Sequence, residues 1–433
     1  MNNKHNKNSS INDSYTVSFF DTILKMKYTP YVIMIFFALM LYLLIYAFGG
    51  NFGPTAHNWF NNYSRQAYSW LQGRLDVPYD RPYLEIAFFG DRMYISFPPF
   101  PSIVLLPIVF LYGYNTPDHI IVLCITLIAL VYAYKIAIKI VKDIKLAMFF
   151  TMFLILGTNY LHISLWGAVW YMAQNMAFTL MLISIYYAIT DKKWHSYISL
   201  FALCASMGCR PFNALYLPVI LFLITKRENV GLLAFARKLV LYAIPAILLG
   251  SFYMWLNYVR FGSIIEFGHN YLPEFTLDYH GQFHPSRITH NLSMMFFGTD
   301  ITYAINHGFP HIGRPTFAFW LASPIFVSFT AYFIAYLHWW RKESTVDSML
   351  IKVIPFLVLL HMFTFSFHRT LGGRQFGSRY IVDTLPVIFF GLLLIVPKFP
   401  RVKHMIINFP LMLFGALINF HGTIMFFIFY FPI

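Results

Sequence analysis

The hydrophobic positions of this chain fall in long runs that short polar segments separate. Apolar runs of roughly 17–25 residues are long enough to cross a bilayer as helices. The pattern therefore predicts about eleven transmembrane helices, with about 10–13 compatible with the shorter runs. The predicted segments are residues 31–48, 119–134, 146–160, 170–190, 196–207, 211–225, 239–258, 316–337, 351–367, 381–396 and 406–431.

The composition strengthens this prediction and excludes two broad classes of protein. The chain has 433 residues, of which 58% are hydrophobic and only 11% are charged, whereas a soluble domain carries about 25% charged residues. An ordinary soluble enzyme and a disordered chain are therefore excluded. We expect an all-α polytopic membrane protein: a polar cytoplasmic tail at residues 1–29 and a single transmembrane domain at residues 30–433.

The distribution of lysines predicts the orientation, because cytoplasmic loops of membrane proteins carry an excess of basic residues. Lysine-containing loops alternate along the chain with loops that have none. The lysines on the predicted inside are Lys4, Lys7, Lys25, Lys27, Lys135, Lys139, Lys142, Lys145, Lys192, Lys193, Lys226, Lys238, Lys342, Lys352, Lys398 and Lys403. The net charge of +14 is thus mainly a topology signal and does not indicate nucleic-acid binding. Two long loops, at about residues 49–118 and 259–315, face the other side.

One apolar segment, PPFPSIVLLPIVFLY at residues 98–112, is short and interrupted by proline. If it crossed the membrane, the basic cluster at residues 135–145 would lie outside. We therefore expect a juxtamembrane or re-entrant helix at the outer interface. The first outer loop then contains its own helices.

Aromatic and small residues at helical spacing predict a second helix in this loop. The residues with this spacing are Trp59, Phe60, Tyr63, Ala67, Tyr68 and Leu71, and a glycine at position 73 suits the helix end. We interpret this segment mainly as a structural helix at the interface.

Four carboxylates follow within a short stretch: Asp76, Asp80, Glu85 and Asp91. Asp76 and Asp80 lie beside proline and arginine, which is typical of turns. Glu85 instead lies in the apolar sequence LEIAFF, where a merely solvated charge would be costly. A carboxylate flanked by aromatic residues near a membrane can have a raised pKa and act as a general base.

Three arginines adjoin predicted spans on the outer side. Arg210 lies in MGCRPFN, and Arg374 and Arg379 lie in HRTLGGRQFGSRYIVDTLP. A charge at membrane depth is costly and is by default a functional hypothesis, and a guanidinium binds phosphate in a bidentate manner. These arginines are candidates for binding an anionic lipid headgroup, whereas most arginines of the outer loops are expected to form surface ion pairs.

Other polar residues permit more than one interpretation. His280 and His284 have a spacing that suits a divalent metal, although they also fit an ordinary polar loop that Pro285 interrupts. Trp170 and Tyr171 predict an aromatic belt at the outer face, with Gln174 just below. Gln174 either contacts substrate or forms a hydrogen bond between helices.

The order of these features resembles the GT-C glycosyltransferases, which include protein mannosyltransferases and the lipid A aminoarabinose transferase. A single span precedes a long outer loop, and SWLQGRLDVP…GDRMYISFPPFPSIVLLPIVFLYG at residues 69–113 is similar to the "GRL…GxxYxxxPP…FG" loop of that superfamily. The pair Arg210–Pro211 and the stretch GGRQFGSRYIVDTLP also match. The architecture covers most of the chain, and uncharacterised bacterial members are the most similar.

The resemblance implies transfer of a sugar from a polyprenyl-phosphate or diphosphate carrier to an acceptor. It places the enzyme in the bacterial inner membrane, with its N-terminus cytoplasmic and its active site extracytoplasmic. A carboxylate would deprotonate the acceptor, and arginines would bind the lipid phosphate. The candidate phosphate ligands are Arg210, Arg374, Arg379 and, from the loop, Arg92.

The chain departs from the superfamily directly after the first span, where many members carry an acidic pair. The sequence there is GGNFGPTAHNWFNNY, without any acid, and His57 occupies this region. Either a residue later in the loop supplies the base, or the catalytic activity has changed or been lost. Glu85 is the preferred candidate for the base, and Asp91 and Asp76 are the alternatives. No cofactor is implied beyond a possible divalent cation in some members of the superfamily.

Two other functions remain open at this level. An O-antigen polymerase or ligase usually has its long outer loop late in the chain, whereas here the first outer loop is at least as long. A transporter or flippase of lipid-linked sugars tends to have inverted repeats and charges at the midplane. The sequence has no evident repeat, and its arginines gather at the predicted outer face.

Overall fold

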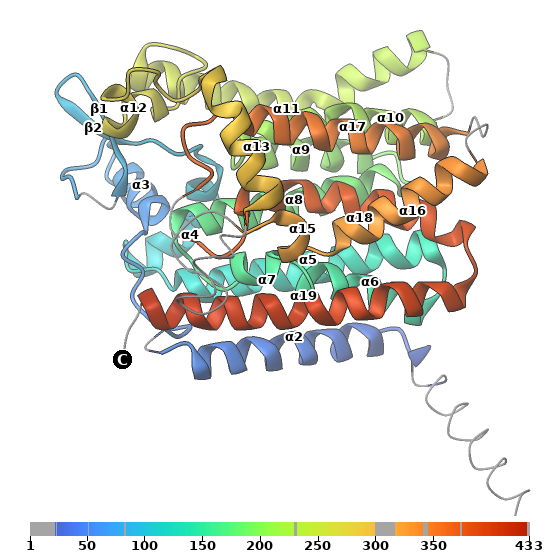
Figure 1. Cartoon of the computed structure of the whole chain (residues 1–433). Coiled ribbons are helices and arrows are strands. Elements are labelled where there is room, and N and C mark those ends of the chain that lie inside the picture. Colours follow the sequence, from blue (N-terminus) through green and yellow to red (C-terminus); the bar gives the residue numbers. More distant parts are fainter. Residues whose placement is uncertain are drawn as a thin grey trace, which may run out of the picture.

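The chain folds into a bundle of helices with a small elaboration at one end (Figure 1). The computed structural model describes residues 22–430 except 23, 51, 82–83, 229–231, 299–316, 341–344 and 373–374. Most of the predicted cytoplasmic tail lies outside these residues. The described part is predominantly helical, which confirms the predicted fold class at the level of an all-α membrane protein.

Within the described residues, six helical segments are long and apolar enough to cross a membrane. They are α2 (Thr29–Phe48), α5 (Asp118–Val141), α11 (Leu232–Phe261), α17 (Val346–Ser366), η5 with α18 (Arg379–Thr384 and Leu385–Ile395, continued by η6 at Val396–Lys398) and α19 (Arg401–Tyr430). The other bundle helices are shorter or more polar: α6 (Ile144–Leu156), α8 (Val169–Ala188), α9 (His195–Met207), α10 (Leu217–Glu228) and α16 (Ile325–Trp340). Every predicted span thus contains a helix, and the number eleven stays a prediction.

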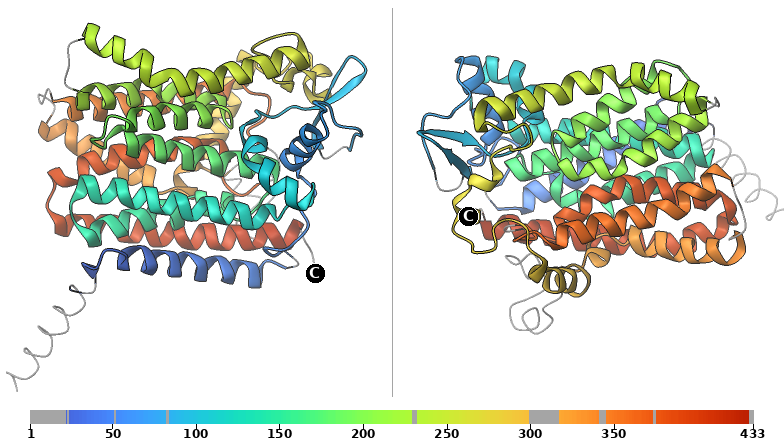
Figure 2. Two further views of the ribbon diagram at one scale, coloured as in Figure 1. Left: turned by 180° about the vertical axis from the view of Figure 1, so that it is seen from behind. Right: turned by 90° about the horizontal axis from the view of Figure 1, so that it is seen from above.

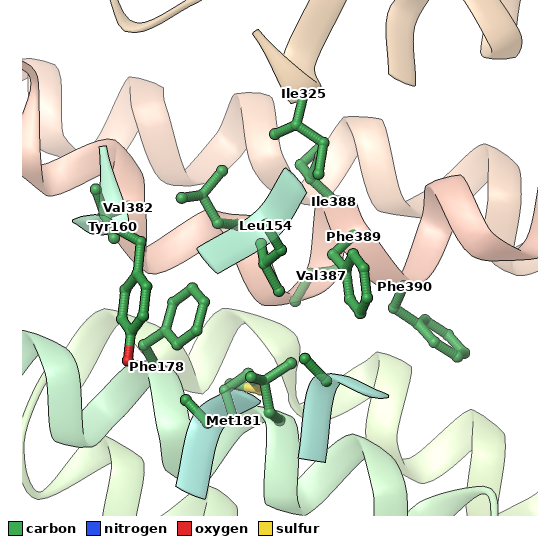
Figure 3. Packing of buried hydrophobic residues seen from close by; sticks show 14 of the residues in the cluster. Leu154, Tyr160, Phe178, Met181, Ile325, Val382, Val387, Ile388, Phe389 and Phe390 are labelled. Atoms are coloured by element: carbon green, nitrogen blue, oxygen red, sulfur yellow. The ribbon is translucent and has the colours of Figure 1, made fainter. Parts of the chain in front are cut away.

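Helix α18 forms the centre of the bundle, because its sequence LPVIFFGLLLI is apolar on all sides. It packs against α5, α8, α16 and α17, and Figure 3 shows its residues Val387 and Phe389 facing Leu154 and Met181. A Cβ at Gly391 would lie 3.0 Å from the ring of Phe329, so glycine permits the close approach of α16. By contrast, α2 and α11 expose long apolar faces, as expected of helices that contact lipid.

Both long loops gather at the same end of the bundle (Figures 1 and 2). The first contains α3 (Asn62–Leu71), strands β1 (Ile86–Phe89) and β2 (Arg92–Ile95), and α4 (Phe100–Tyr112). The second contains η3 (His269–Tyr271), α12 (Pro273–Thr276), η4 (Pro285–Arg287) and α13 (Ile288–Phe297). Short α7 (Tyr160–Ile163), η2 (Pro211–Tyr216) and α15 (Phe319–Ala322) complete the fold.

The predicted loop helices are confirmed as helices. The amphipathic segment is α3, which begins only at Asn62, so the predicted residues Trp59 and Phe60 precede the helix. It ends just before Gly73, which has a left-handed φ of 71°. The proline-interrupted segment is α4, fixed to α3 by the hydroxyl of Ser102, which donates to Gln66 Oε1 at 2.7 Å. Its placement at a membrane interface stays a prediction.

The antiparallel hairpin β1–β2 is a feature that the sequence analysis missed. Phe89 pairs with Arg92 across a two-residue turn at Gly90 and Asp91. Gly90 has a φ of 58°, the positive value that tight hairpin turns require. The all-α description is therefore corrected by one small sheet, and this hairpin carries Glu85 at its base.

Candidate active site

A cavity of about 920 Å³ lies where the two long loops meet the bundle. Its walls come from α3, the hairpin, the start of α8, the turn after α9, the second long loop and the segment around η5. Many of the lining side chains are aromatic: Trp59, Phe60, Tyr63, Phe97, Trp166, Trp170, Tyr171, Phe212, Phe267, Phe275, Phe283, Phe365 and Tyr380. An apolar cavity with a few converging polar groups is typical of a site for a small molecule or lipid headgroup.

Glu85 lines this cavity and adopts an unusual backbone conformation. Its φ is +50°, in the left-handed region that non-glycine residues rarely adopt. The hydroxyl of Ser96 donates to the Glu85 carbonyl at 3.1 Å, and the Asn62 amide donates to the carbonyl of Leu84. These contacts hold the strained backbone, and such strain is frequent at functional sites.

The carboxylate of Glu85 accepts a hydrogen bond from Trp170 Nε1 at 3.1 Å. Burial raises the pKa of Glu85 to about 7, and nearby Glu274 acts in the same direction. The Trp170 hydrogen bond and the charge of Arg379 oppose this rise. A carboxylate with a pKa near neutral pH can accept a proton during a reaction, as the sequence predicted for this residue.

Arg210 reaches the cavity from the turn between α9 and η2. Its Nε donates to Asp383 Oδ2 at 2.8 Å, and the side chain of Asp383 is fully buried. The other oxygen of Asp383 accepts from Gln174 Nε2 at 2.7 Å. Gln174 also donates to the carbonyl of Arg379 at 2.5 Å. Gln174 therefore links α8 to η5, which agrees with the interhelical alternative for this residue.

Arg379 and Arg210 form a pair of neighbouring cations. The two guanidinium groups lie over the ring of Tyr380, at 4.8 Å and 4.9 Å from its centre. Arg210 Nη2 and Arg379 Nη1 are both buried, and neither has a hydrogen-bond partner within the described residues. A buried donor without a partner is unfavourable by about 1–3 kcal/mol. Two such donors in one cavity suit the oxygens of an anionic ligand.

Several predicted site residues lie away from this cavity. Asp76 forms a surface ion pair of 2.6 Å with Arg74, whose hydrogen bond lowers the pKa of Asp76. Asp91 and Arg92 are exposed at the tip of the hairpin. His57 is exposed, with its ring 4.5 Å from that of Trp59.

Arg374 lies outside the described residues, so its predicted role as a phosphate ligand is untested. The structure thus brings together Glu85, Arg210 and Arg379 with the predicted pocket residues Trp170 and Tyr171.

The possible metal ligands His280 and His284 stack on each other, with ring centres 3.8 Å apart. His284 Nδ1 is engaged by Ser286 at 2.7 Å. In the part of the chain that the structure describes, no group of three or more His, Cys, Asp or Glu side chains is arranged to hold a metal ion. Neither histidine lines the cavity, and their role as metal ligands stays a prediction.

Three acidic or histidine residues of the cavity, His269, Glu274 and His368, were not predicted from the sequence, and neither was the buried partner Asp383. The first two come from the second long loop, whose sequence gives no sign that it folds over the first. Asp383 did carry a signal, because it is a single acid within the apolar run RYIVDTLP. Such an acid needs a buried partner.

Comparisons of the chain with protein-family models and with curated proteins give no match. The resemblance to the GT-C superfamily therefore remains an expectation from motifs and their order. Function is therefore inferred from the cavity and from the chemistry of its side chains.

Proposed function

We propose that this protein is a membrane glycosyltransferase of the GT-C type. It transfers a sugar from a polyprenyl-phosphate or diphosphate carrier to an acceptor at the extracytoplasmic face of the membrane. The observation that supports this most is the meeting, in one cavity, of Glu85 with its raised pKa and two arginines with unpaired, buried N–H groups. Those are the two kinds of group that such a transfer requires.

In the proposed reaction the bond between the anomeric carbon and the carrier phosphate breaks. The acceptor hydroxyl attacks from the opposite face of the sugar, and its proton passes to the carboxylate of Glu85. The phosphate retains the electron pair of the broken bond. A single displacement of this kind inverts the anomeric configuration.

The arginine pair has the chemistry to bind the departing phosphate. Both arginines line the cavity, and each has a buried N–H group without a partner within the described residues. We place the departing phosphate, where charge develops, at these two side chains. Fixed donors in a site of low polarity stabilise developing charge more effectively than water does. Asp383 holds the guanidinium of Arg210, and Gln174 holds the backbone carbonyl of Arg379, so both residues are fixed at the cavity wall.

The position of the cavity also favours a lipid-linked donor. The cavity lies where the two long loops meet the bundle, and α4 begins two residues after Pro98 of the cavity wall. Phe110 and Leu111 of α4 are highly exposed apolar side chains. Helix α4 packs on α3, which contributes Tyr63 to the cavity wall. A polyprenyl chain lying in the membrane would then reach the site with its phosphate first.

The test is transfer of a radiolabelled sugar by membranes that contain the protein, with a panel of polyprenyl-phosphate and polyprenyl-diphosphate sugars as donors. We expect Arg379→Gln to lower transfer by about 10²–10³-fold, the usual effect of removing one donor to a developing charge. The matched control is Arg92→Gln, which changes an exposed arginine of the hairpin. Its activity should stay within about twofold of wild type.

Equal transfer by both variants would exclude the arginine pair as the phosphate site. If the well-folded wild-type protein transfers no sugar from any donor of the panel, the proposal is wrong. In that case, movement of the same lipid-linked sugars across vesicle membranes would indicate a transporter.

A further inference from the structure

One ring nitrogen of the cavity residue His269 has a hydrogen-bond partner, and the other has none within the described residues. Its Nδ1 lies 3.0 Å from the carbonyl oxygen of Ser96. A carbonyl only accepts hydrogen bonds, so Nδ1 carries the proton and Nε2 carries a lone pair. Within the described residues no hydrogen bond to Nε2 is present, and His269 lines the cavity.

The second histidine of the cavity, His368, is arranged differently. Its Nδ1 lies 2.7 Å from the carbonyl of Thr370, and its Nε2 lies 3.1 Å from the amide of Gln282. Both ring nitrogens are therefore engaged. Of the two cavity histidines, His269 has the nitrogen that can accept a further proton.

The fixed charges of the arginine pair leave a divalent anion incompletely neutralised. Arg210 and Arg379 supply two positive charges, and the buried carboxylate of Asp383 cancels one of them. A phosphate monoester carries a charge of about −1.5 to −2 at pH 7. Uncompensated charge beside a mostly aromatic wall is more costly than in water, because the local dielectric constant is lower.

We propose that His269 takes up one proton when a divalent oxyanion binds at Arg210 and Arg379, and so becomes the third cation of the anion site. This inference deepens the proposed function and rests on it for the identity of the anion, which would be the departing carrier phosphate. The binding event itself requires only a divalent oxyanion and the empty cavity.

The groups around His269 determine whether anion binding raises or lowers its pKa. Burial lowers the pKa of His269, and the charge of Arg210 acts in the same direction, while the Ser96 carbonyl and Glu266 oppose both. The other charged and histidine side chains on the cavity wall are His368, Glu274, Glu85 and Arg379, and the remaining titratable ones are Tyr63, Tyr171, Tyr380 and Cys209. An anion at Arg210 neutralises the nearest positive charge and adds an attractive negative one. The pKa of His269 then rises, so the ring binds a proton near neutral pH.

Every proton and electron pair of the proposed transfer is accounted for. The acceptor proton goes to Glu85, and the leaving phosphate keeps the electron pair of the bond to the sugar. The lone pair of His269 Nε2 binds a proton from solvent as the phosphate gains its second charge. Departure of the carrier phosphate releases that proton again.

Sulfate is the appropriate probe, because it is a divalent oxyanion that does not titrate near neutral pH. Its binding to the purified full chain in detergent is measured by isothermal titration calorimetry in buffers of different ionisation enthalpy. The slope of the observed enthalpy against that of the buffer gives the number of protons taken up. We expect about one proton per sulfate for the wild-type protein at pH 7.5.

His269→Asn should still bind sulfate, but with proton uptake near zero and with affinity that no longer falls as pH rises from 6.5 to 8.5. The matched control is His57→Asn, which changes an exposed histidine outside the cavity and should keep the wild-type uptake. Asparagine retains an N–H donor for the Ser96 carbonyl, so a general loss of folding is not expected. Thermal unfolding of each variant checks this point.

Sulfate binding without proton uptake by the wild-type protein would overturn the proposal, and so would unchanged uptake in His269→Asn. An absence of sulfate binding would also overturn it. The proposed transferase function fails separately: if sulfate binding is coupled to His269 and no donor sugar is transferred, only the assignment of the anion as a carrier phosphate is lost.

Discussion

Two buried aspartates, Asp383 and Asp118, are held by different kinds of partner. Both lie at the end of the bundle that carries the long loops, and both are almost completely buried. Each uses both carboxylate oxygens in hydrogen bonds. They differ in the charge of their partners and in whether those partners retain N–H groups without a hydrogen bond.

The partners of Asp118 are neutral side chains that are fully occupied. Asn58 Nδ2 donates to Asp118 at 2.6 Å and to the carbonyl of Gly167 at 2.9 Å. The hydroxyls of Ser64 and Thr116 complete the cluster. Asp118 also begins α5, where a negative charge favours the helix N-terminus. This cluster joins the first long loop to α5 and to the turn before α8.

The partner of Asp383 is the charged side chain of Arg210, and that side chain retains a buried N–H group without a partner. Arg379, which contacts the same Tyr380 ring, has a second such group. Buried polar groups are nearly always satisfied in folded proteins, and both arginines line the cavity, so we expect a ligand to use these donors. The comparison predicts that changes in the cavity affect activity, whereas changes around Asp118 affect stability.

The largest effect is expected for Glu85→Gln, which keeps the shape of the side chain and removes the proton acceptor. Sugar transfer should fall by about 10²–10⁴-fold, the usual contribution of a general base. The midpoint of thermal unfolding should not decrease, because burial of the charged form is unfavourable at this position. Asp91→Asn, at the exposed hairpin turn, is the matched control and should transfer normally.

A Glu85→Gln protein with full activity would remove Glu85 as the base. Attention would then turn to the remaining predicted candidates, Asp76, Asp91 and His57. A large loss of thermal stability in this variant would instead show that the comparison between the two regions is wrong.

A smaller effect, on stability, is expected for Asp118→Ala. The variant leaves the donors of Asn58, Ser64 and Thr116 without their shared acceptor, which should lower the free energy of unfolding by about 1–3 kcal/mol. Thermal unfolding in detergent measures this loss, with Asp80→Ala at an exposed position of the same loop as the control. Transfer per folded molecule should change little. A selective loss of transfer with normal stability would place Asp118 in the catalytic machinery.

The smallest effect is expected for Trp170→Phe, which removes the hydrogen bond to the Glu85 carboxylate. That bond favours the charged form and lowers the pKa of Glu85, so its loss should raise the pKa above about 7. A base must be deprotonated, so wild-type transfer should rise as pH increases through about 7. The variant's pH–rate profile should move to higher pH, with a several-fold loss at pH 6.5 and none at pH 9.

Trp194→Phe is the control for this shift, because Trp194 is an exposed tryptophan before α9, away from the cavity. Identical pH profiles in wild type and Trp170→Phe would show that the Trp170–Glu85 hydrogen bond does not tune the reaction.

The sequence predicted the class of protein and the position of nearly every helix, because both follow from local hydropathy. A run such as that of α2 or α19 is apolar over its whole length and needs no partner to be recognised. The sequence also singled out Glu85, because an acid in an apolar segment is costly without a special environment. The hairpin was missed because its two strands have only four residues each and lie among helical signals.

The tertiary structure alone decided which of these residues meet. Arg210 and Asp383 are separated by 173 positions along the chain, and Trp170 and Glu85 by 85 positions. Hydropathy indicates whether a segment is buried, but it does not indicate which other segment it packs against. The local pattern therefore cannot predict that these side chains are in contact. Their distances depend on how α8, α9, η5 and the two long loops pack. The sequence thus determined a helical membrane protein with unusual buried charges, and the packing of distant segments brought those charges into one cavity.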